Sequence, residues 1–350
     1  MAINCDTFQA TREALQRKLS TVLPDSEISR KAELVFEINR LKLERNAVIL
    51  GHNYMEPALF HGVADIVGDS LELARQATLV DRDPIVFCGV RFMAETAKIL
   101  NPNRTVLLPG QEAGCSLAAS ITAADVQDLR RRFPGAPIVC YINVYAEVKA
   151  EVDIICTSGN AEKIVRSLTD DLIVFIPDEY LARNVAISTG KRLVVAGEVQ
   201  DSEVSNQKNV LLAWRGCCEV HERFTIEDVK NLRKQFPDAV VLAHPECHPD
   251  VAQAADYAGG TSGMIEFIKQ SHVKRFALLT ECSMADNIVA EFPGKEAVRL
   301  CSLRCPHMHE ITLEQTLHAL RNNEQVIEIP EDLRVRARQP LDRMLEMSFK

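Results

Sequence analysis

The chain has 350 residues, 47% of them hydrophobic and 25% charged, and carries a formal net charge of −9 at pH 7. The acidic balance argues against a nucleic-acid-binding surface, which needs a basic patch, and no run approaches the roughly 18 apolar residues of a membrane helix. The N-terminus lacks the basic-then-apolar layout of a signal peptide, so we expect a cytosolic protein. A chain of this length is expected to form two or three domains. In that reducing compartment the eleven cysteines are thiols, metal ligands or nucleophiles rather than a disulfide framework.

The chain opens with a polar stretch, residues 1–29, which reads as a weakly ordered or surface-lying extension. Residues 30–44 then carry apolar side chains at helical spacing and predict an amphipathic helix. This helix leads into an apolar strand at 47–50, which is followed by a polar tip at 52–54. The strand and its tip form the unit around which the rest of the chain is organised.

The same unit occurs three times. Each copy has an apolar strand with a polar tip, an aspartate 12 or 13 residues after the tip, and a hydroxyl residue five residues after the aspartate. The three pairs are Asp65 with Ser70, Asp153 with Ser158, and Asp256 with Thr261. Because chance rarely repeats such offsets, they indicate an internal triplication.

Short apolar strands alternate with helices in all three copies. Strands of this kind are typical of parallel sheets that are covered by helices on both faces. They are expected at 47–50, 85–88 and 105–108 in the first copy, at 138–141, 172–176 and 193–196 in the second, and at 239–243, 276–279 and 298–300 in the third. The polar residues between 197 and 209 read as a surface insertion in the second copy.

We therefore predict an α/β fold of three similar small three-layer α/β/α domains with parallel sheets, arranged around a pseudo-threefold axis. Units of about 90 residues gain stability by sharing a core. Ligands bind beyond the carboxyl ends of parallel strands, so the three strand tips should line one central site. The predicted segments are an N-terminal extension (1–29), three α/β domains (30–121, 122–224 and 225–311) and C-terminal helices (312–350) that pack back on the first domain.

Three cysteines hold equivalent places in the copies. Cys115, Cys218 and Cys305 each lie seven residues before a threonine that opens a helix with a capping-box pattern, whereas their neighbours Cys217 and Cys301 do not. Soft sulfur ligands select zinc, copper or iron–sulfur, and three lone thiolates leave one position open, as in a 4Fe–4S cluster that binds substrate. Cys305 with the proline after it resembles the ending of ferredoxin motifs. The alternative is that the three cysteines only pack as small apolar residues.

The hydroxyl residues allow two interpretations. Ser70, Ser158 and Thr261 each lie near a predicted helix start, where they either cap the helix or help to bind an anion. In the second interpretation they form a cradle for a carboxylate or a phosphate together with polar residues at the strand tips. Those tip residues are His52, Tyr141, Asn143 and His244.

His244 and Glu246 are the best acid–base pair in the sequence, because a carboxylate near an imidazole can be tuned toward a neutral pKa. His221 follows Cys218 by three residues. It is either a hydrogen-bond donor to that cysteine or a ligand of the substrate, and its spacing alone leaves both roles open.

Several motifs together resemble the quinolinate synthase family from about residue 32 to the C-terminus. They are GHNYMEP, GDSLELA, CGVRFMAETAKILNP, EAGCSLA, Tyr-x-Asn with AEVKAE, CTSGNA, CEVHERFT, AHPEC and CPHMHEITLE. The resemblance implies a three-domain transferase with a 4Fe–4S cluster on Cys115, Cys218 and Cys305, used as a Lewis acid. It implies condensation of iminoaspartate with dihydroxyacetone phosphate to quinolinate, with loss of phosphate and two waters, for NAD biosynthesis. An aspartate oxidase or dehydrogenase is then the implied source of iminoaspartate.

Carried over by motif, the resemblance also assigns roles to individual residues. The implied catalytic residues are His52, Tyr54, His244 and Glu246. The implied substrate-binding residues are His52, Ser70, Tyr141, Asn143, Ser158, His221, His244, Glu246 and Thr261. In this interpretation Glu246, with His244 and Tyr54 nearby, moves protons during enamine attack, tautomerisation and the dehydrations, and the cradle neutralises carboxylates.

The chain departs from the family pattern at three positions near the expected cradle. Val144 and Gly260 stand where the family commonly has hydroxyl residues, and Gly159 stands where it often has alanine. If these positions contact the ligand, Gly260→Ser and Val144→Thr should tighten dicarboxylate binding. An iron–sulfur hydro-lyase acting on a small hydroxy acid and a non-enzymatic iron or redox sensor are the alternative functions, and neither of them would form quinolinate.

Overall fold

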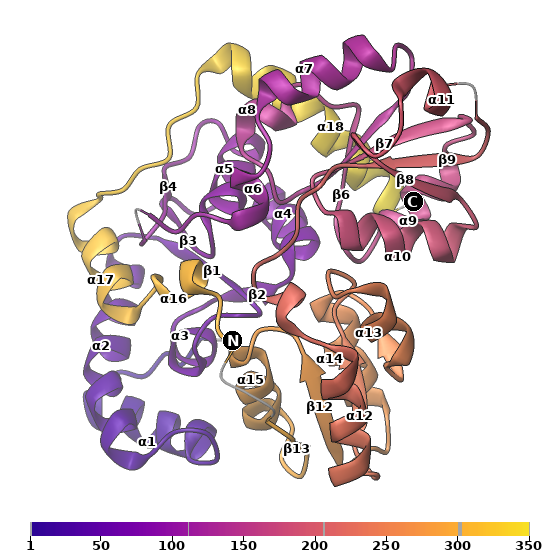
Figure 1. Cartoon of the computed structure of the whole chain (residues 1–350). Helices are drawn as coiled ribbons and strands as arrows, with labels where there is room; N and C mark the ends of the chain where they lie inside the picture. The colour runs from indigo at the N-terminus through magenta and orange to yellow at the C-terminus, as the bar shows by residue number, and fades with distance from the viewer. Residues whose placement is uncertain (1, 111, 206, 300–302, 350) are drawn as a thin grey trace.

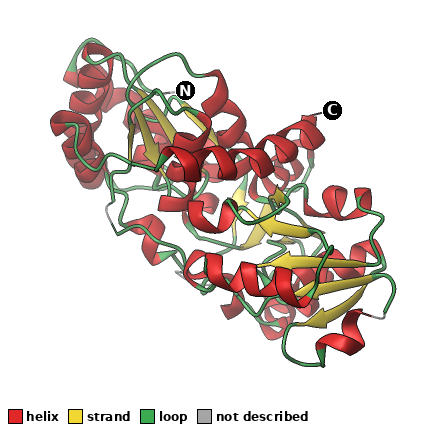
Figure 2. Ribbon diagram, turned by 90° about the horizontal axis from the view of Figure 1, so that it is seen from above, coloured by secondary structure: helices red, strands yellow, loops and turns green. Residues whose placement is uncertain are grey.

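The chain forms three parallel β-sheets, which the computed structural model describes with their helices for residues 2–110, 112–205, 207–299 and 303–349. The sheets lie in three lobes around a common centre (Figure 1). Helices lie on both sides of the strands, so each lobe has three layers (Figure 2). The predicted α/β class, with three similar units built on parallel sheets, is confirmed.

The first sheet has the strand order β2-β1-β3-β4 and is parallel throughout. Its strands are β1 (Val48–His52), β2 (Ile66–Gly68), β3 (Ile85–Cys88) and β4 (Val106–Leu107). The helices of this lobe are α2 (Asp25–Glu44), α3 (Pro57–Gly62), α4 (Ser70–Leu79), α5 (Arg91–Leu100) and α6 (Ser116–Ala119). Strands β1 and β3 are buried along their whole length, which explains why their sequences are apolar rather than alternating.

The N-terminal residues are not the loose extension that their polar sequence suggested. They form α1 (Phe8–Leu19), which packs against α2 and α3. Leu15, Leu19 and Ile28 are fully buried in the core of the first lobe. Of the two alternatives expected for residues 1–29, the weakly ordered one is wrong, because a narrow apolar stripe is enough to hold a mostly polar helix on the surface of a core.

The second sheet has five strands in the order β6-β5-β7-β9-β8. They are β5 (Ile138–Tyr141), β6 (Ile154–Cys156), β7 (Leu172–Ile176), β8 (Arg192–Val195) and β9 (Val210–Ala213). The helices are α7 (Ala123–Arg132), α8 (Ala146–Lys149), α9 (Ala161–Ser167), α10 (Glu179–Thr189), α11 (Asp201–Ser205) and the 3₁₀ helix η1 (His221–Arg223). The run predicted as the third strand of this copy is β8, which lies at the sheet edge, while the fully buried β9 takes the place beside β7.

The third sheet repeats the first, in the order β11-β10-β12-β13. Its strands are β10 (Val240–Ala243), β11 (Tyr257–Ala258), β12 (Arg275–Leu279) and β13 (Glu296–Ala297). The helices are α12 (Ile226–Gln235), α13 (Pro249–Ala254), α14 (Thr261–Gln270), α15 (Ser283–Glu291) and α16 (Pro306–His309). The strand predicted at 298–300 is displaced to β13, and Leu300 itself lies outside the described residues.

Two C-terminal helices close the molecule. Helix α17 (Leu313–Asn322) packs against α2 of the first lobe. Helix α18 (Glu331–Phe349) packs against α5 of the first lobe and against α8 and β6 of the second. The C-terminal segment thus contacts two lobes rather than the first alone, and the exact limits of the five predicted segments stay a prediction.

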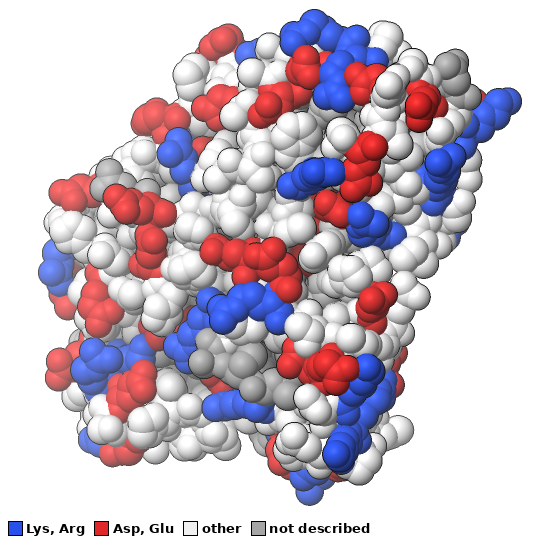
Figure 3. Space-filling view, in the orientation of Figure 1, with Lys and Arg blue, Asp and Glu red and all other residues white. Residues whose placement is uncertain are grey.

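On the face of the molecule drawn in Figure 3, acidic and basic side chains are interspersed. Within the described ranges, no helix is both long and apolar enough to cross a bilayer.

An aspartate ties two strands of each sheet together near their amino ends. The backbone N–H of Ile49 donates to the Asp65 carboxylate at 2.9 Å, and the Asp65 N–H donates back to the Ile49 carbonyl at 2.9 Å. The same exchange joins Asp153 to Ile138 and Asp256 to Val241. The aspartate of the triplicated pattern therefore fixes the register of the two strands whose far ends carry the polar tip and the hydroxyl residue.

The three aspartates differ in their cationic partners, which yields a stability test. Lys42 is fully buried, and its Nζ lies 2.9 Å from Asp65, so Asp65→Ala leaves an ammonium without its counter-charge. Breaking a buried pair in this way costs about 3–5 kcal/mol. The partner of Asp256 is the half-exposed Arg233, so Asp256→Ala mainly orphans a backbone N–H, at about 1–3 kcal/mol. Urea unfolding followed by circular dichroism measures both variants, and equal losses would contradict this account.

Candidate active site

A cavity lies where the three lobes meet. His52 ends β1, Tyr141 ends β5 and His244 directly follows β10, so the carboxyl end of one strand from each sheet reaches it. Every residue that the sequence singled out for the site lines this cavity. They are His52, Tyr54, Ser70, Cys115, Tyr141, Asn143, Ser158, Cys218, His221, His244, Glu246, Thr261 and Cys305.

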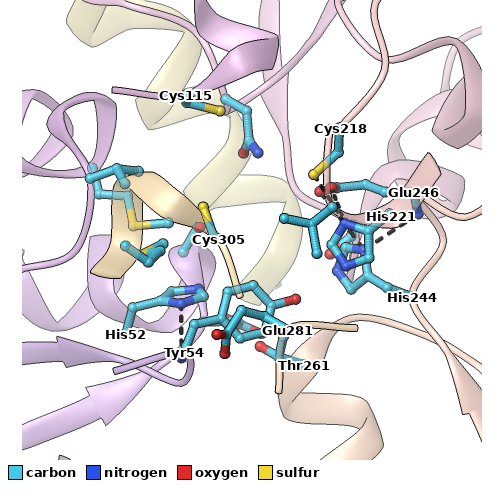
Figure 4. A pocket seen from close by; sticks show the side chains of 18 of the residues that line it. His52, Tyr54, Cys115, Cys218, His221, His244, Glu246, Thr261, Glu281 and Cys305 are labelled. Carbon is cyan, nitrogen blue, oxygen red and sulfur yellow. Dashed lines mark hydrogen bonds and ion pairs between the residues drawn. The ribbon is translucent and has the colours of Figure 1, made fainter. Parts of the chain in front are cut away.

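The three equivalent cysteines face the same space. Figure 4 shows the sulfur atoms of Cys115, Cys218 and Cys305 pointing toward one another across the cavity. Burial raises the pKa of the Cys115 thiol to about 12 and that of Cys305 to about 11, and it raises the pKa of Cys218 as well. In all three, backbone N–H groups of the turn after the cysteine act in the opposite direction and favour the thiolate.

The neighbouring cysteines do not share this position. Cys217 does not line the cavity, and its thiol interacts with Tyr180 instead. Cys301 lies outside the described residues. The choice of Cys218 over Cys217, made from sequence spacing, therefore agrees with which of the two side chains faces the cavity.

Glu246 is the centre of a buried hydrogen-bond network. His221 Nδ1 lies 2.7 Å from one carboxylate oxygen, and the Tyr141 hydroxyl donates to the other. Burial works against the charged form, but the two neighbouring imidazoles and these hydrogen bonds outweigh it and hold the pKa of Glu246 below its ordinary value. Glu246 is therefore a carboxylate at neutral pH.

The imidazole in hydrogen-bond contact with the Glu246 carboxylate is His221, whereas the sequence had paired Glu246 with His244, whose Nδ1 accepts the Glu246 backbone N–H at 3.3 Å. His244 Nδ1 is 3.8 Å from the carboxylate, and its ring stacks on His221 with centroids 4.5 Å apart. Burial lowers the pKa of His244 to about 3 and that of His52 to about 4. Both rings are thus neutral at pH 7 and act as hydrogen-bonding groups.

Two functional neighbours escaped the sequence analysis. Thr280 Oγ1 lies 2.6 Å from the Tyr54 hydroxyl and 2.8 Å from His221 Nε2, which completes a chain of contacts from Tyr54 to Glu246. Glu281 lines the cavity directly. Both follow β12, and the rule that ligands bind beyond the carboxyl ends of parallel strands was the signal that could have found them.

The hydroxyl residues are not simple helix caps. Ser70 and Thr261 are the first residues of α4 and α14, whose N-caps are Asp69 and Gly260. The Thr261 hydroxyl instead accepts a hydrogen bond from Asn53 at 2.9 Å. Nearby, the buried side-chain oxygen of Asn143 has no hydrogen-bond partner. Helix starts and hydroxyl groups that line one cavity favour the interpretation as an anion cradle over that of plain capping. The Asn143 oxygen is an acceptor and suits a donor group of a ligand rather than an anion.

The structure separates the three departures from the family pattern. Val144 is fully buried and does not line the cavity, so its missing hydroxyl is not a lost ligand contact. A Cβ atom on Gly260 would lie 2.9 Å from the Ser158 hydroxyl and 3.4 Å from the Gly159 backbone nitrogen. The two glycines therefore fit one another, and the expected benefit of adding side chains here is not supported.

Comparison with known proteins gives consistent matches. The model of the family described as quinolinate synthetase A protein matches residues 36–346. Quinolinate synthase 2 of Mesorhizobium japonicum is 49% identical over 97% of this chain and 99% of its own length. The quinolinate synthase of Sinorhizobium fredii is 49% identical over 95% of this chain and 88% of its own, and that of Xylella fastidiosa is 52% identical over 89% and 86%.

The contact between Gly260 and Ser158 predicts the effect of restoring the family residue. Gly260→Ser should push the Ser158 hydroxyl out of place and weaken the binding of a pyridine dicarboxylate. A hydrogen bond to a charged group contributes roughly 1.5–3 kcal/mol, so we expect the Kd to rise roughly 10- to 100-fold. Isothermal titration calorimetry measures it, with Val144→Thr as the control whose affinity stays unchanged. Tighter binding by Gly260→Ser would show that Ser158 is not a ligand contact.

Proposed function

The chain belongs to the quinolinate synthetase A family, and from that premise we propose how its central cavity makes quinolinate for NAD biosynthesis. The substrates are iminoaspartate and dihydroxyacetone phosphate, which condense with loss of phosphate and two waters. One observation carries the proposal: three thiols, a hydrogen-bond network around an ionised carboxylate, and hydroxyl groups suited to bind an anion all line a single cavity. An aspartate oxidase or dehydrogenase would supply the unstable iminoaspartate.

Cys115, Cys218 and Cys305 would hold a 4Fe–4S cluster. The donor set fits such a group, because the three sulfurs come from three loops, face one space and have backbone N–H groups beside them that favour thiolate. His221 Nδ1 lies 3.2 Å from the Cys218 sulfur and would orient that ligand. With three protein ligands, such a cluster would leave one iron open and would supply Lewis-acid chemistry there.

Glu246 is the base that the chain itself provides. Its carboxylate is held in place by Tyr141 and His221, and its charge is already present at neutral pH. It removes a proton from carbon or nitrogen of the substrate during enamine formation and tautomerisation. Burial keeps the pKa of Tyr54 above its ordinary value, so the Tyr54 hydroxyl stays protonated and able to donate a hydrogen bond.

Ser70, Ser158 and Thr261 would bind the charged ends of the substrates. The N-terminal turns of α4 and α14 point backbone N–H groups at the same region, and helix starts favour carboxylate and phosphate groups. Asn143 offers a buried side-chain oxygen that has no donor among the described residues, and this oxygen would accept a hydrogen bond from an N–H or O–H group of a substrate. These groups fix the orientation of two small anions so that their reacting carbons meet, which lowers the entropic part of the barrier.

The two alternative functions explain fewer of these contacts. A hydro-lyase of a small hydroxy acid would use the open iron and one anion site, but it has no need for hydroxyl groups from three different lobes. An iron or redox sensor would use the thiols, but that function would not explain the hydrogen-bond network around Glu246. Formation of quinolinate from the two substrates separates the proposal from both.

The first test concerns the base. Glu246→Gln keeps the size of the side chain and an acceptor for the Tyr141 hydroxyl, so the fold and the cluster should persist. Turnover should fall about 100- to 10,000-fold, the usual contribution of general acid–base catalysis. Quinolinate formation under anaerobic conditions measures the loss, and the visible spectrum checks the cluster. Turnover near that of the unmodified enzyme would remove Glu246 from the mechanism.

The second test concerns the ligands of the cluster. Serine in place of Cys115, Cys218 or Cys305 should abolish iron binding, since an alcohol is a poor ligand for iron at neutral pH. Cys217→Ser is the matched control, because Cys217 is adjacent in sequence yet does not line the cavity. Iron and sulfide content per chain, with the visible absorption spectrum, measures all four variants. A colourless Cys217→Ser protein beside a coloured Cys218→Ser protein would overturn the ligand assignment.

A further inference from the structure

Glu281 is a second carboxyl group in the cavity to which neither the sequence nor the network of Glu246 gave a role. It lies two residues after the end of β12 and is only 2% exposed. Figure 4 shows it at the wall of the cavity to which Tyr54 and Thr261 also belong. Val90, two residues after the end of β3, lines the cavity from the equivalent place in the first lobe. A carboxyl group here is therefore not a requirement of the repeated fold.

The surroundings of Glu281 leave its charge poorly compensated. One carboxylate oxygen accepts the Ser283 backbone N–H at 2.7 Å, and the other accepts the Ser283 hydroxyl at 3.2 Å. In the described part of the chain, no lysine, arginine or histidine lies within ion-pair distance of this carboxylate. Burial raises its pKa to about 7, against the opposing effects of Ser283 and Arg304 and with a smaller contribution from Asp286. Tyr54 and Cys305 also face it, and both are uncharged while protonated.

The two glutamates that line the cavity therefore differ in their hydrogen-bond partners and in the direction of their pKa shifts. Glu246 has imidazole and phenol partners and is ionised. Glu281 has neither partner among the described residues, and with a pKa of about 7 it is half protonated at pH 7 and largely neutral below it. Pairs of carboxyl groups whose environments push their pKa values apart are the usual arrangement for one base and one acid in the same site. The proposed reaction needs both, because each dehydration removes a proton at one atom and a hydroxyl group at another.

We propose that Glu281 is the general acid that protonates a leaving hydroxyl group of the substrate during quinolinate formation. This inference rests on the proposed function and deepens it. The Glu281 O–H bond breaks as its proton passes to the hydroxyl oxygen. The carbon–oxygen bond then breaks with its electron pair going to oxygen, and water leaves. The electrons of a C–H or N–H bond whose proton Glu246 accepts form the new double bond. One proton is given and one is taken, so no oxidant or reductant is needed, and solvent exchange resets both groups.

The test compares the pH dependence of kcat in three proteins that carry the cluster. The unmodified enzyme should lose activity as pH rises through about 7, because the acid form of Glu281 is lost. Glu281→Gln should lower kcat at pH 6.5 by about 100-fold and should show no such decline. Ser283→Ala removes a hydrogen bond that favours the charged form, so the decline should move to higher pH. Glu33→Gln, an exposed glutamate of α2, is the control with an unchanged profile.

Two further readouts separate a catalytic from a structural role. The melting temperature of Glu281→Gln should not fall, since the variant removes a poorly compensated buried acid, and its Kd for quinolinate should stay within about twofold of the unmodified enzyme. A Glu281→Gln enzyme that retains kcat, or one that keeps the decline near pH 7, would overturn the role of Glu281 alone. An unmodified enzyme that forms no quinolinate would overturn the proposed function together with this inference.

Discussion

The two-way hydrogen-bond exchange between an aspartate and a strand residue is the constraint on which the rest of the structure depends. It occurs once in each sheet, between Asp65 and Ile49, Asp153 and Ile138, and Asp256 and Val241. Because two adjacent parallel strands are locked at their amino ends, the heights at which their carboxyl ends deliver the polar tip and the helix start are fixed as well. Three copies of one local arrangement thus bring three strand ends to one place, and the cavity lies where they meet.

We propose that this cavity binds anions without fixed positive charges. Among its described lining residues there is no lysine or arginine. A cation there would pair with the ionised Glu246 and neutralise the base, so the design uses helix starts, hydroxyl groups and neutral imidazoles instead. The same absence leaves Glu281 without a counter-charge. One carboxyl group is held ionised by its neighbours, whereas burial raises the pKa of the other to about 7, although both line the same cavity.

The triplicated offsets were enough to predict the fold class and the convergence of the site. Spacing alone selected Cys218 rather than Cys217, and strand tips identified His52, Tyr141 and His244, because parallel strands deliver their carboxyl ends to one edge. The spacing of residues in the sequence could not predict side-chain contacts between lobes. The contact of the Glu246 carboxylate with His221 rather than His244, and the place of Thr280 between Tyr54 and His221, depend on how the three lobes dock.

Other errors arose where local pattern and tertiary context disagree. The sequences of β8 and β9 are similar apolar runs, and either could form the strand beside β7 in the second sheet. Hydrophobic periodicity does not indicate which of the two is the edge strand. The mostly polar composition of α1 obscured the narrow apolar stripe through which this helix packs on the core. The expected effect of Gly260→Ser also changes sign once the structure is known, because the residue that the new side chain would meet, Ser158, belongs to another lobe and is distant in sequence.

The central claim is that three lobes each give one thiol to a single iron–sulfur cluster inside this cavity. Anomalous diffraction at the iron absorption edge from crystals grown without oxygen tests it most directly. The account predicts one compact iron peak bounded by the sulfurs of Cys115, Cys218 and Cys305, with no protein ligand on the side that faces Glu246. An iron peak outside the cavity, or one bound by Cys217 in place of Cys218, would contradict it.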